Sequence, residues 1–212
     1  MRITILYDNT AFREDLQPDW GFSCLVELAD RTILFDTGGD GSILMDNMNK
    51  LDIDPSTVDD VFISHAHFDH TGGLSAFLNK NNDVNVYLPV SFRGVRNARE
   101  ITYLDEPSRL HENVFSTGEL DRIEQSMAVK TDKGLILVVG CSHPRMSHIL
   151  DAASRFGKVS GIIGGLHGFD DYELFEDLAM ICPTHCTVHI KEIKSRYPDK
   201  YVQGGAGRVI DL

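Results

Sequence analysis

Four side chains that can bind a metal ion fall within six positions of one short run, residues 64–73 (SHAHFDHTGG). They are His65, His67, Asp69 and His70. Neutral imidazoles and carboxylates are the ligands that zinc, iron and manganese take from proteins. The alternative interpretation is a solvated polar junction between a strand and a loop, but unrelated imidazoles rarely lie so close together. The run therefore predicts a metal site.

The spacing within this run favours two metal positions over one. The stretch 58–64 (VDDVFIS) ends in a short apolar, β-type run, so the side chains of the motif lie where a strand ends. In an extended chain His65 and His67 point the same way, because side chains alternate with a period of two. After the following turn, Asp69 and His70 can face a second ion about 3.5–4 Å from the first, as two-metal hydrolytic sites require.

Three more histidines follow apolar strands at points where buried backbone gives way to a loop. His143 follows GLILVVG, His167 stands in GGLHG, and His185 stands in PTHC. Because the chain already has a metal motif, we expect His143 and His185 to be ligands. His167 stays open between a ligand and an unliganded catalytic residue. The histidines interpreted as surface or supporting residues are His111, His148 and His189.

One acidic residue is placed to support the ligands. Asp36 ends the apolar run 32–36 and begins the turn Asp-Thr-Gly-Gly. A carboxylate at the end of a neighbouring strand can accept the free N–H of a ligating imidazole and fix its tautomer. We expect Asp36 to serve both in the turn and as this support.

The longest stretch without a clear strand is residues 91–109. Three arginines, Arg93, Arg96 and Arg99, recur at every third position in it, and Arg109 follows. On a helix they would form one basic stripe that could clamp a phosphate or carboxylate, and the stretch could act as a lid. A solvated charged face is the favoured interpretation, because charge runs usually are one.

Composition is that of one soluble globular domain over residues 1–212, with 42% hydrophobic and 25% charged residues. The formal charge of −12 argues against nucleic acid as a partner, since binding its backbone requires a basic face. No run approaches the ~20 apolar residues that span a bilayer. We therefore expect a small-molecule substrate, no nucleic-acid partner and no membrane partner.

The four cysteines do not have the spacing of a disulfide framework, which favours a reducing, cytoplasmic location. They are Cys24, Cys141, Cys182 and Cys186. The last two flank His185 but lack a second cysteine pair, so we interpret them as small buried hydrophobic residues rather than zinc ligands.

Strands and helices alternate in two blocks. The expected strands are 2–6, 22–28, 32–36, 84–88, 125–131, 134–140, 159–163 and 179–182. The expected helices are 42–50, 74–79, 146–156, 172–178 and 187–196. Two strand-rich blocks with interleaved helices imply two packed sheets with helices outside. The strongest polar clusters follow strands, where sites of such folds collect.

Taken together, these motifs resemble the metallo-β-lactamase superfamily. The resemblance rests on the histidine motif, on Asp36-Thr37-Gly38 before it, and on the later strand-end motifs, and it covers nearly the whole chain. Within the superfamily, the order of these motifs is similar to that of the branch that contains the dihydropterin ribofuranosylaminobenzene phosphate synthases. Two departures from the synthase-like pattern, Pro144-Arg145-Met146 after His143 and Gly168 after His167, disfavour a pterin substrate.

The resemblance implies an α/β (α+β) fold, a four-layer αββα sandwich of two mixed sheets with outer helices. It also implies a dinuclear site along one sheet edge, with His65 and His67 on the first ion and Asp69 and His70 on the second. His143 and His185 match the later ligand motifs. Two alternatives stay open: Cys141 could be the ligand with His143 as its neighbour, and Glu124 could fill a position that histidine holds elsewhere.

The expected function is that of a metal-dependent hydrolase or related transferase with two divalent ions, zinc first, and manganese, iron or magnesium as alternatives. A metal-activated water would attack an ester, phosphoester or pyrophosphate-type small molecule, with an anionic substrate as one option. Asp69 would orient the nucleophile and accept its proton, and His167 would donate to the developing oxyanion. The alternative is a mononuclear iron oxidoreductase. A non-catalytic binding module is disfavoured, because the ligand set is complete.

Overall fold

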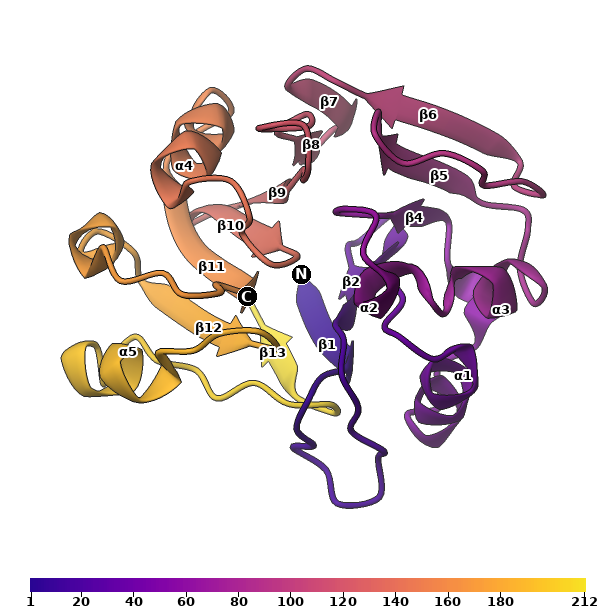
Figure 1. Cartoon of the computed structure of the whole chain (residues 1–212), viewed down its shortest axis with the longest axis horizontal. Helices are drawn as coiled ribbons and strands as arrows, with labels where there is room; N and C mark the ends of the chain where they lie inside the picture. Colours follow the sequence, from indigo (N-terminus) through magenta and orange to yellow (C-terminus); the bar gives the residue numbers. More distant parts are fainter.

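The computed structural model describes residues 1–212, which form two β-sheets with helices on their outer faces (Figure 1). The first sheet has seven strands in the order β13-β1-β2-β3-β4-β5-β6. In that order the strands are β13 (Val209–Asp211), β1 (Arg2–Tyr7), β2 (Ser23–Glu27), β3 (Thr32–Phe35), β4 (Asp60–Phe62), β5 (Asn85–Pro89) and β6 (Glu100–Leu104).

The second sheet has six strands in the order β12-β11-β10-β9-β8-β7. They are β12 (Met180–Thr184), β11 (Val159–Gly165), β10 (Gly134–Val139), β9 (Met127–Thr131), β8 (Val114–Ser116) and β7 (Ser108–His111). In each sheet some neighbours run parallel, β3 to β6 in the first and β10 to β12 in the second, and the others antiparallel. The expected sandwich of two mixed sheets is confirmed.

The helices cover the outer faces of both sheets (Figure 1). Those beside the first sheet are α1 (Gly41–Lys50), α2 (Phe68–Thr71) and α3 (Leu74–Leu78), and those beside the second are α4 (Met146–Ser154) and α5 (Ile190–Arg196). Two short 3-10 turns, Pro55–Thr57 and Tyr172–Phe175, complete the elements. Asp40 caps α1 by accepting from the backbone N–H groups of Ser42 and Ile43, which satisfies donors that a helix start leaves free. None of the helices is long and apolar enough to span a bilayer.

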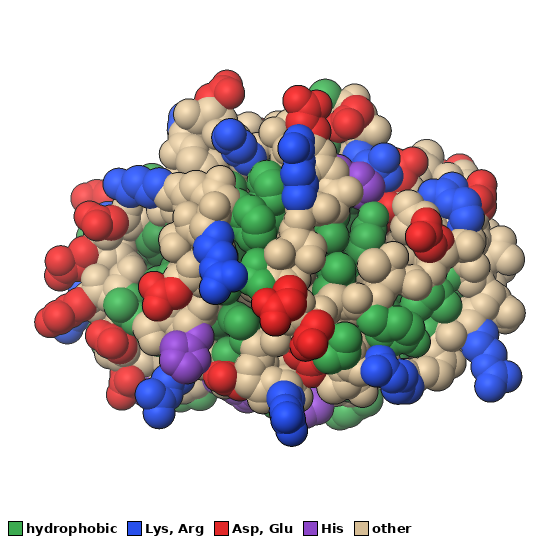
Figure 2. Space-filling model, turned by 90° about the horizontal axis from the view of Figure 1, so that it is seen from above, with side chains coloured by type: hydrophobic (Ala, Val, Ile, Leu, Met, Phe, Trp, Pro, Cys, Tyr) green, Lys and Arg blue, Asp and Glu red, His purple; other side chains and the backbone are tan.

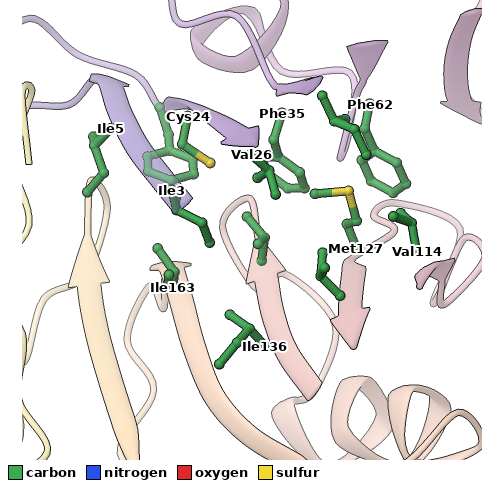
Figure 3. Close-up of a cluster of buried hydrophobic side chains, with 14 of the residues drawn as sticks. Ile3, Ile5, Cys24, Val26, Phe35, Phe62, Val114, Met127, Ile136 and Ile163 are labelled. Atoms are coloured by element: carbon green, nitrogen blue, oxygen red, sulfur yellow. The ribbon is translucent and has the colours of Figure 1, made fainter. Parts of the chain in front are cut away.

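Three buried hydrophobic layers hold the four structural layers together. The middle layer lies between the sheets and is drawn in Figure 3, where Phe35 and Phe62 face Met127 and Val114. One outer layer joins the first sheet to α1 and α3, and the other joins the second sheet to α4 and α5. The alternation of side chains along each strand explains this arrangement, because one face of each sheet serves the middle layer and the other serves the helices.

The parallel strands place the carboxyl ends of several strands at one edge of the sandwich. Each stretch with a predicted site residue follows such a strand: Asp36 follows β3, the histidine motif follows β4, His143 follows β10, His167 follows β11 and His185 follows β12. Because parallel strands end on the same side, the sheet order brings these loops together.

The structure also contains strands that the sequence does not reveal. Residues 91–109, expected to lack a clear strand, include β6 and the start of β7, while β8 and β13 lie outside every predicted element. These strands have three to five residues and lie at or near sheet edges, where little of the alternating hydrophobic pattern develops.

The arginines of this region do not form one helical stripe. Gly94 and Asn97 have positive φ angles of 96° and 63°, which a helix through these positions does not allow. The guanidinium of Arg93 lies 4.4 Å from the centre of the Tyr103 ring, and Arg99 pairs with Asp83 at 3.1 Å. Both arginines are exposed, as the solvated-face interpretation requires.

Charges of both signs are mixed over the face shown in Figure 2. The chain has 32 acidic and 20 basic residues, and on this face the Asp and Glu side chains stand among the Lys and Arg side chains. The acidic excess is therefore not gathered into one patch there.

Candidate metal centre

Three imidazoles converge where the sequence predicts the first metal ion. The Nε2 atom of His65 lies 3.0 Å from Nδ1 of His67, and Nε2 of His143 lies 3.1 Å from the same Nδ1 atom. One ring nitrogen from each residue lies within 4.8 Å of the other two. His65 is fully buried, whereas the side chain of His67 is exposed. These three nitrogens could hold one ion and leave its outer side open.

A carboxylate and two imidazoles converge beside them. The Oδ2 atom of Asp69 lies 3.2 Å from Nε2 of His185 and 4.0 Å from Nε2 of His70. The Nε2 atom of His185 is buried and makes no hydrogen bond of acceptable geometry, even to the Asp69 oxygen beside it. A buried polar atom without a partner is costly, and a metal ion would supply the missing partner. We call His65, His67 and His143 the first triad, and Asp69, His70 and His185 the second triad. The donor chemistry of both triads therefore fits divalent zinc, iron or manganese.

The local backbone explains how one short run serves both triads. His67 is extended, with φ −65° and ψ 145°, and the next residue begins the single turn of α2 that carries Asp69 and His70. The turn then packs on the loop after β3. A Cβ atom at Gly72 would lie 2.1 Å from the carbonyl oxygen of Gly39, so only glycine permits this approach.

Asp36 supports both triads from beneath, as the sequence predicts. Its buried Oδ2 accepts a hydrogen bond from Nδ1 of His70 at 2.7 Å. The same oxygen accepts from the hydroxyl of Ser64, whose Oγ lies 2.9 Å from Nδ1 of His65. When Nδ1 of each imidazole donates in this way, Nε2 is left free to face the centre.

Glu124 holds the loop after β10 and does not face the centre. One of its carboxylate oxygens accepts from the backbone N–H groups of Gly140, Cys141 and Ser142, and the other accepts from that of His143. Burial raises the pKa of Glu124, and these bonds oppose that rise. Both oxygens of Glu124 are thus engaged by the backbone, and Glu124 is not among the donor groups that converge at the centre.

Sulfur and a further imidazole adjoin the triads. The Sγ atom of Cys141 lies 3.1 Å from Nε2 of His70, and Cys186 is buried beside it. Cys182 is buried in the middle layer, as expected for a small hydrophobic residue. His167 is exposed on the solvent side of the centre, which we call the mouth of the site, and its ring centre lies 4.6 Å from that of His143.

The segment between β1 and β2 contributes residues that sequence reasoning missed. Asn9 accepts through Oδ1 from Nδ1 of His185 at 2.9 Å, which orients that ring. The indole Nε1 of Trp20 donates to Oδ2 of Asp69 at 2.9 Å. The signals available were an Asp-Asn pair directly after a strand and a Trp-Gly pair before the next one, both too common in turns to identify a site.

The loops of the centre hold several non-glycine residues in the left-handed region of φ. Asp36, Ser142, His167 and His185 have φ angles of 45° to 58°, and they are four of the eight such residues in the chain. This backbone conformation is uncommon outside glycine and tends to occur at functional sites, where the surrounding structure enforces it.

The imidazoles differ in protonation according to their surroundings. Burial lowers the pKa of His143 to about 4, with the neighbouring His167 as the next cause, and burial likewise lowers that of His65. Burial alone would lower the pKa of His70 too, but Asp36 raises it. Asp69 has a lowered pKa despite its burial, because it pairs with His185. His65 and His143 are therefore neutral at pH 7, as metal ligands must be.

The remaining predicted residues lie apart from the centre. His111 bonds instead to Asp60, with Nε2 2.9 Å from Oδ2. His148 and His189 lie 3.6 Å and 3.9 Å from acidic neighbours on the surface, Asp121 and Glu192. The structure thus brings together all six predicted ligands and His167, and leaves these three histidines outside.

The chain matches the model of the metallo-β-lactamase superfamily over residues 18–190 and belongs to that superfamily. Its fold family binds divalent metals, and most of its members are metal-dependent hydrolases. The expected fold class and family are confirmed.

Individual relatives match over nearly the full chain. One is the 7,8-dihydropterin-6-methyl-4-(beta-D-ribofuranosyl)-aminobenzene-5'-phosphate synthase of Methanocaldococcus jannaschii, 26% identical over 98% of this chain and 95% of that protein. Among solved structures, a metal-dependent hydrolase of the β-lactamase superfamily superposes with a TM-score of 0.81 at 26% identity, covering 100% and 99% of the two chains. The zinc-bound PqqB of Methylobacterium extorquens has a TM-score of 0.65 at 12% identity, covering both chains fully, and shows the shared fold alone.

Replacing Asp36 tests the support beneath the triads. The Asp36→Asn substitution keeps the shape but removes the charge that His70 and Ser64 bond to, so we expect zinc affinity to fall about 10- to 100-fold. Competition against a chromophoric chelator measures it. Asp60→Asn is the control, because Asp60 is equally buried but bonds to Arg31 and His111 instead. An equal loss in both variants would contradict a specific role for Asp36.

The pH dependence of stability tests the neutral imidazoles. In the metal-free folded protein the pKa of His143 is about 4, against an ordinary value of 6.5. Between these values the unfolded chain holds more protons on this side chain, so its contribution is present above pH 6.5 and is lost as the pH falls through 4. With chelator present, we expect the urea midpoint to fall from pH 7 to pH 5, and to fall less in His143→Gln. An equal fall of the urea midpoint in both proteins would count against the lowered pKa of His143.

Proposed function

We propose that this protein is a metal-dependent hydrolase that cleaves an ester, phosphoester or pyrophosphate-type small molecule. The observation that carries the proposal is the convergence of two complete donor triads at one edge of the sandwich. One triad is His65, His67 and His143, and the other is Asp69, His70 and His185. The similar structure described as a metal-dependent hydrolase supports the reaction class.

In this proposal each triad would hold one divalent ion. Such ions supply a bound water whose pKa is lowered toward ~7, and they act as a Lewis acid on the substrate oxygen. Zinc is the ion we propose first, because imidazole nitrogens dominate the donor set.

Two side chains would handle protons and charge. Asp69 lies at the junction of the triads with a lowered pKa, so it is ionised at pH 7 and can orient the nucleophile and accept its proton. His167 is exposed at the mouth, and burial of its ring together with His67 lowers its pKa. A neutral imidazole there donates a hydrogen bond to the oxygen that becomes negative during attack.

Apolar side chains surround the mouth and bear on the substrate. Trp20, Phe68 and Val188 are 52%, 68% and 69% exposed. The Trp20 ring lies 5.0 Å from that of His185, Phe68 stands between two ligands in sequence, and the N–H of Val188 donates to the carbonyl of His167. Exposed hydrophobic residues grouped beside polar donors are typical of ligand sites, which favours a substrate with an apolar portion next to the cleaved group.

Metal content and turnover together test the proposal. We expect protein purified without added metal to contain about two zinc, iron or manganese atoms per chain, and to hydrolyse chromogenic esters or phosphodiesters. His67→Ala should lose one ion and reduce turnover by roughly 100-fold or more, because the first position then lacks a donor. His189→Ala is the control, since this histidine lies outside the centre.

Two results would contradict the proposal. One is a single tightly held iron with oxygen-dependent turnover, which would favour an iron oxidoreductase on this fold. The other is the absence of bound metal from both proteins after reconstitution with zinc.

Trp20 gives a separate prediction about the substrate. Trp20→Phe keeps an aromatic wall but removes the hydrogen bond to Asp69, so we expect kcat to fall with KM nearly unchanged. Trp20→Ala removes the wall as well, so KM should also rise, by about tenfold for a lost apolar contact of 1–3 kcal/mol. Tyr103→Ala is the control, because Tyr103 is a comparably exposed aromatic on edge strand β6. An unchanged KM in Trp20→Ala would rule out the apolar wall.

A further inference from the structure

Two consecutive residues, Asp8 and Asn9, bond to almost every polar group of His185. The backbone N–H of His185 donates to Oδ1 of Asp8 at 2.8 Å, and its backbone carbonyl accepts from Nδ2 of Asn9 at 3.0 Å. Its ring Nδ1 donates to Oδ1 of Asn9 at 2.9 Å. Only Nε2 makes no hydrogen bond, and it faces Oδ2 of Asp69 at 3.2 Å. One dipeptide therefore fixes both the backbone and the ring of this predicted ligand.

We propose that Asp8 and Asn9 form a clamp that positions His185, and that this clamp controls metal binding by the second triad without affecting the first. This inference deepens the proposed function and rests on the metal centre described there. Neither residue of the clamp is among the donor groups that converge at the centre. Both act through His185, so they are positioning residues.

The fold brings the clamp to His185 from the opposite sheet. Strands β1 and β3 both pair antiparallel with β2, so they run in the same direction, and β1 ends at the edge where the parallel strands of the first sheet end. Asp8 directly follows β1, and His185 directly follows β12 of the second sheet. The two residues are 177 positions apart in sequence, so it is the packing of the two sheets that brings them together.

The backbone conformation of His185 explains why a clamp is needed. Its φ angle of 48° lies in the left-handed region, which residues other than glycine rarely adopt. Such a conformation persists only where the surrounding structure enforces it. The bonds at the N–H and at the carbonyl of His185 engage its backbone on both sides of the Cα atom. Without them, we expect the loop after β12 to relax to a more usual φ and to turn Nε2 away from Asp69.

The clamp is itself held in a buried network. Asp8 is 3% exposed, and its Oδ1 also accepts from the N–H of Asn9 at 2.8 Å. The backbone carbonyl of Asp8 accepts from the N–H of Asp19 at 3.2 Å, and Oδ1 of Asn9 accepts from the N–H of Gly21 at 3.2 Å. These bonds tie the clamp to the far end of the loop between β1 and β2. Because several donors share a buried carboxylate and a neighbouring amide, the clamp has little freedom to move.

The amide of Asn9 also determines which ring nitrogen of His185 is offered to the centre. Its Nδ2 faces a carbonyl oxygen and its Oδ1 faces the N–H of Gly21, so Oδ1 is the atom that accepts from Nδ1 of His185. Nε2 is therefore unprotonated and presents a lone pair to a carboxylate oxygen of Asp69. Two acceptors that face each other repel, and a bound cation would remove that repulsion. The clamp thus prepares the second triad for a metal ion.

The first triad has a different anchor. The backbone N–H of His143 donates to Oε2 of Glu124 at 2.9 Å, and no hydrogen bond joins Asp8 or Asn9 to a residue of that triad. Glu124 and Asp8 have corresponding roles, because each is a buried carboxylate that accepts from the backbone N–H of one histidine. Since the two contacts are separate, we expect that the second triad can be weakened while the first is kept.

Zinc binding by Asp8→Asn and Asn9→Ala tests the proposal without measuring turnover. We expect the natural protein to bind one zinc ion in each triad. Each variant should keep the ion of the first triad and bind the other about 10- to 100-fold more weakly, as when a ligand loses its support. Elemental analysis at buffered concentrations of free zinc counts the bound ions. Asn9 is only half-buried, so Asn9→Ala carries the test if Asp8→Asn does not fold.

Trp20 provides a spectroscopic signal from the second triad. It is the single tryptophan of the chain, its Nε1 donates to Oδ2 of Asp69 at 2.9 Å, and its ring lies 5.0 Å from that of His185. Zinc in the second triad should therefore change the fluorescence emission of Trp20. In both clamp variants this change should require about 10- to 100-fold more zinc, and His185→Gln should abolish it.

Asp59→Asn is the matched control. Asp59 also accepts from a backbone N–H, that of Thr32 at 2.9 Å, but it precedes β4, at the opposite end of that strand from the histidine motif. An equal loss of zinc affinity in Asp59→Asn, or an equal weakening of both ions in the clamp variants, would overturn the selective role of the clamp.

The remaining outcomes separate this inference from the proposed function. Clamp variants that bind both ions as tightly as the natural protein would overturn the clamp and leave the metal centre intact. If the natural protein itself binds no zinc, the metal centre is contradicted, and the proposed function with it.

Discussion

The buried carboxylate of Asp36 is the contact on which the centre depends. It is fully enclosed, and burial of an unpaired charge would cost several kcal/mol. Its bonds to His70 and Ser64 repay that cost, and through Ser64 it also reaches His65. The loop after β4 can therefore adopt only the conformation that aims these imidazoles at the same space, so the stability of the fold and the geometry of the site rest on one group.

Glu124 has the corresponding role on the second sheet. It fixes the loop after β10, and the segment around it also bonds across to the first sheet: Gln125 donates through its backbone to Ser64 and through its side chain to Ile63. The two ligand-bearing loops are thus tied to each other and not only to their own sheets. Close-packed layers alone would leave such loops free to move, whereas hydrogen bonds from buried carboxylates specify one arrangement.

The sequence predicts the parts of this arrangement that depend on local pattern. The histidine motif, Asp36 and the strand-end histidines all follow strongly apolar strands, so their common edge could be inferred from the alternation of elements. The contributions of Asn9 and Trp20 could not, because they come from a long loop between β1 and β2 whose path is set by tertiary contacts. The helical stripe considered as an alternative for Arg93, Arg96 and Arg99 is absent for a related reason: two residues between them, Gly94 and Asn97, have positive φ angles that break a helix.

The centre has a closed side and an open side, and this asymmetry relates structure to chemistry. His65 and His70 are fully buried, and a hydrogen bond at Nδ1 fixes each of their rings. His67 and His167, in contrast, are exposed at the mouth, as is Phe68. Donors on the closed side cannot rearrange, so they would set the position of an ion bound there. Groups on the open side remain accessible to a substrate. The same sandwich edge can therefore keep its inner ligand geometry while the mouth determines which molecule is bound, since loops tolerate change that a buried hydrogen-bond network does not.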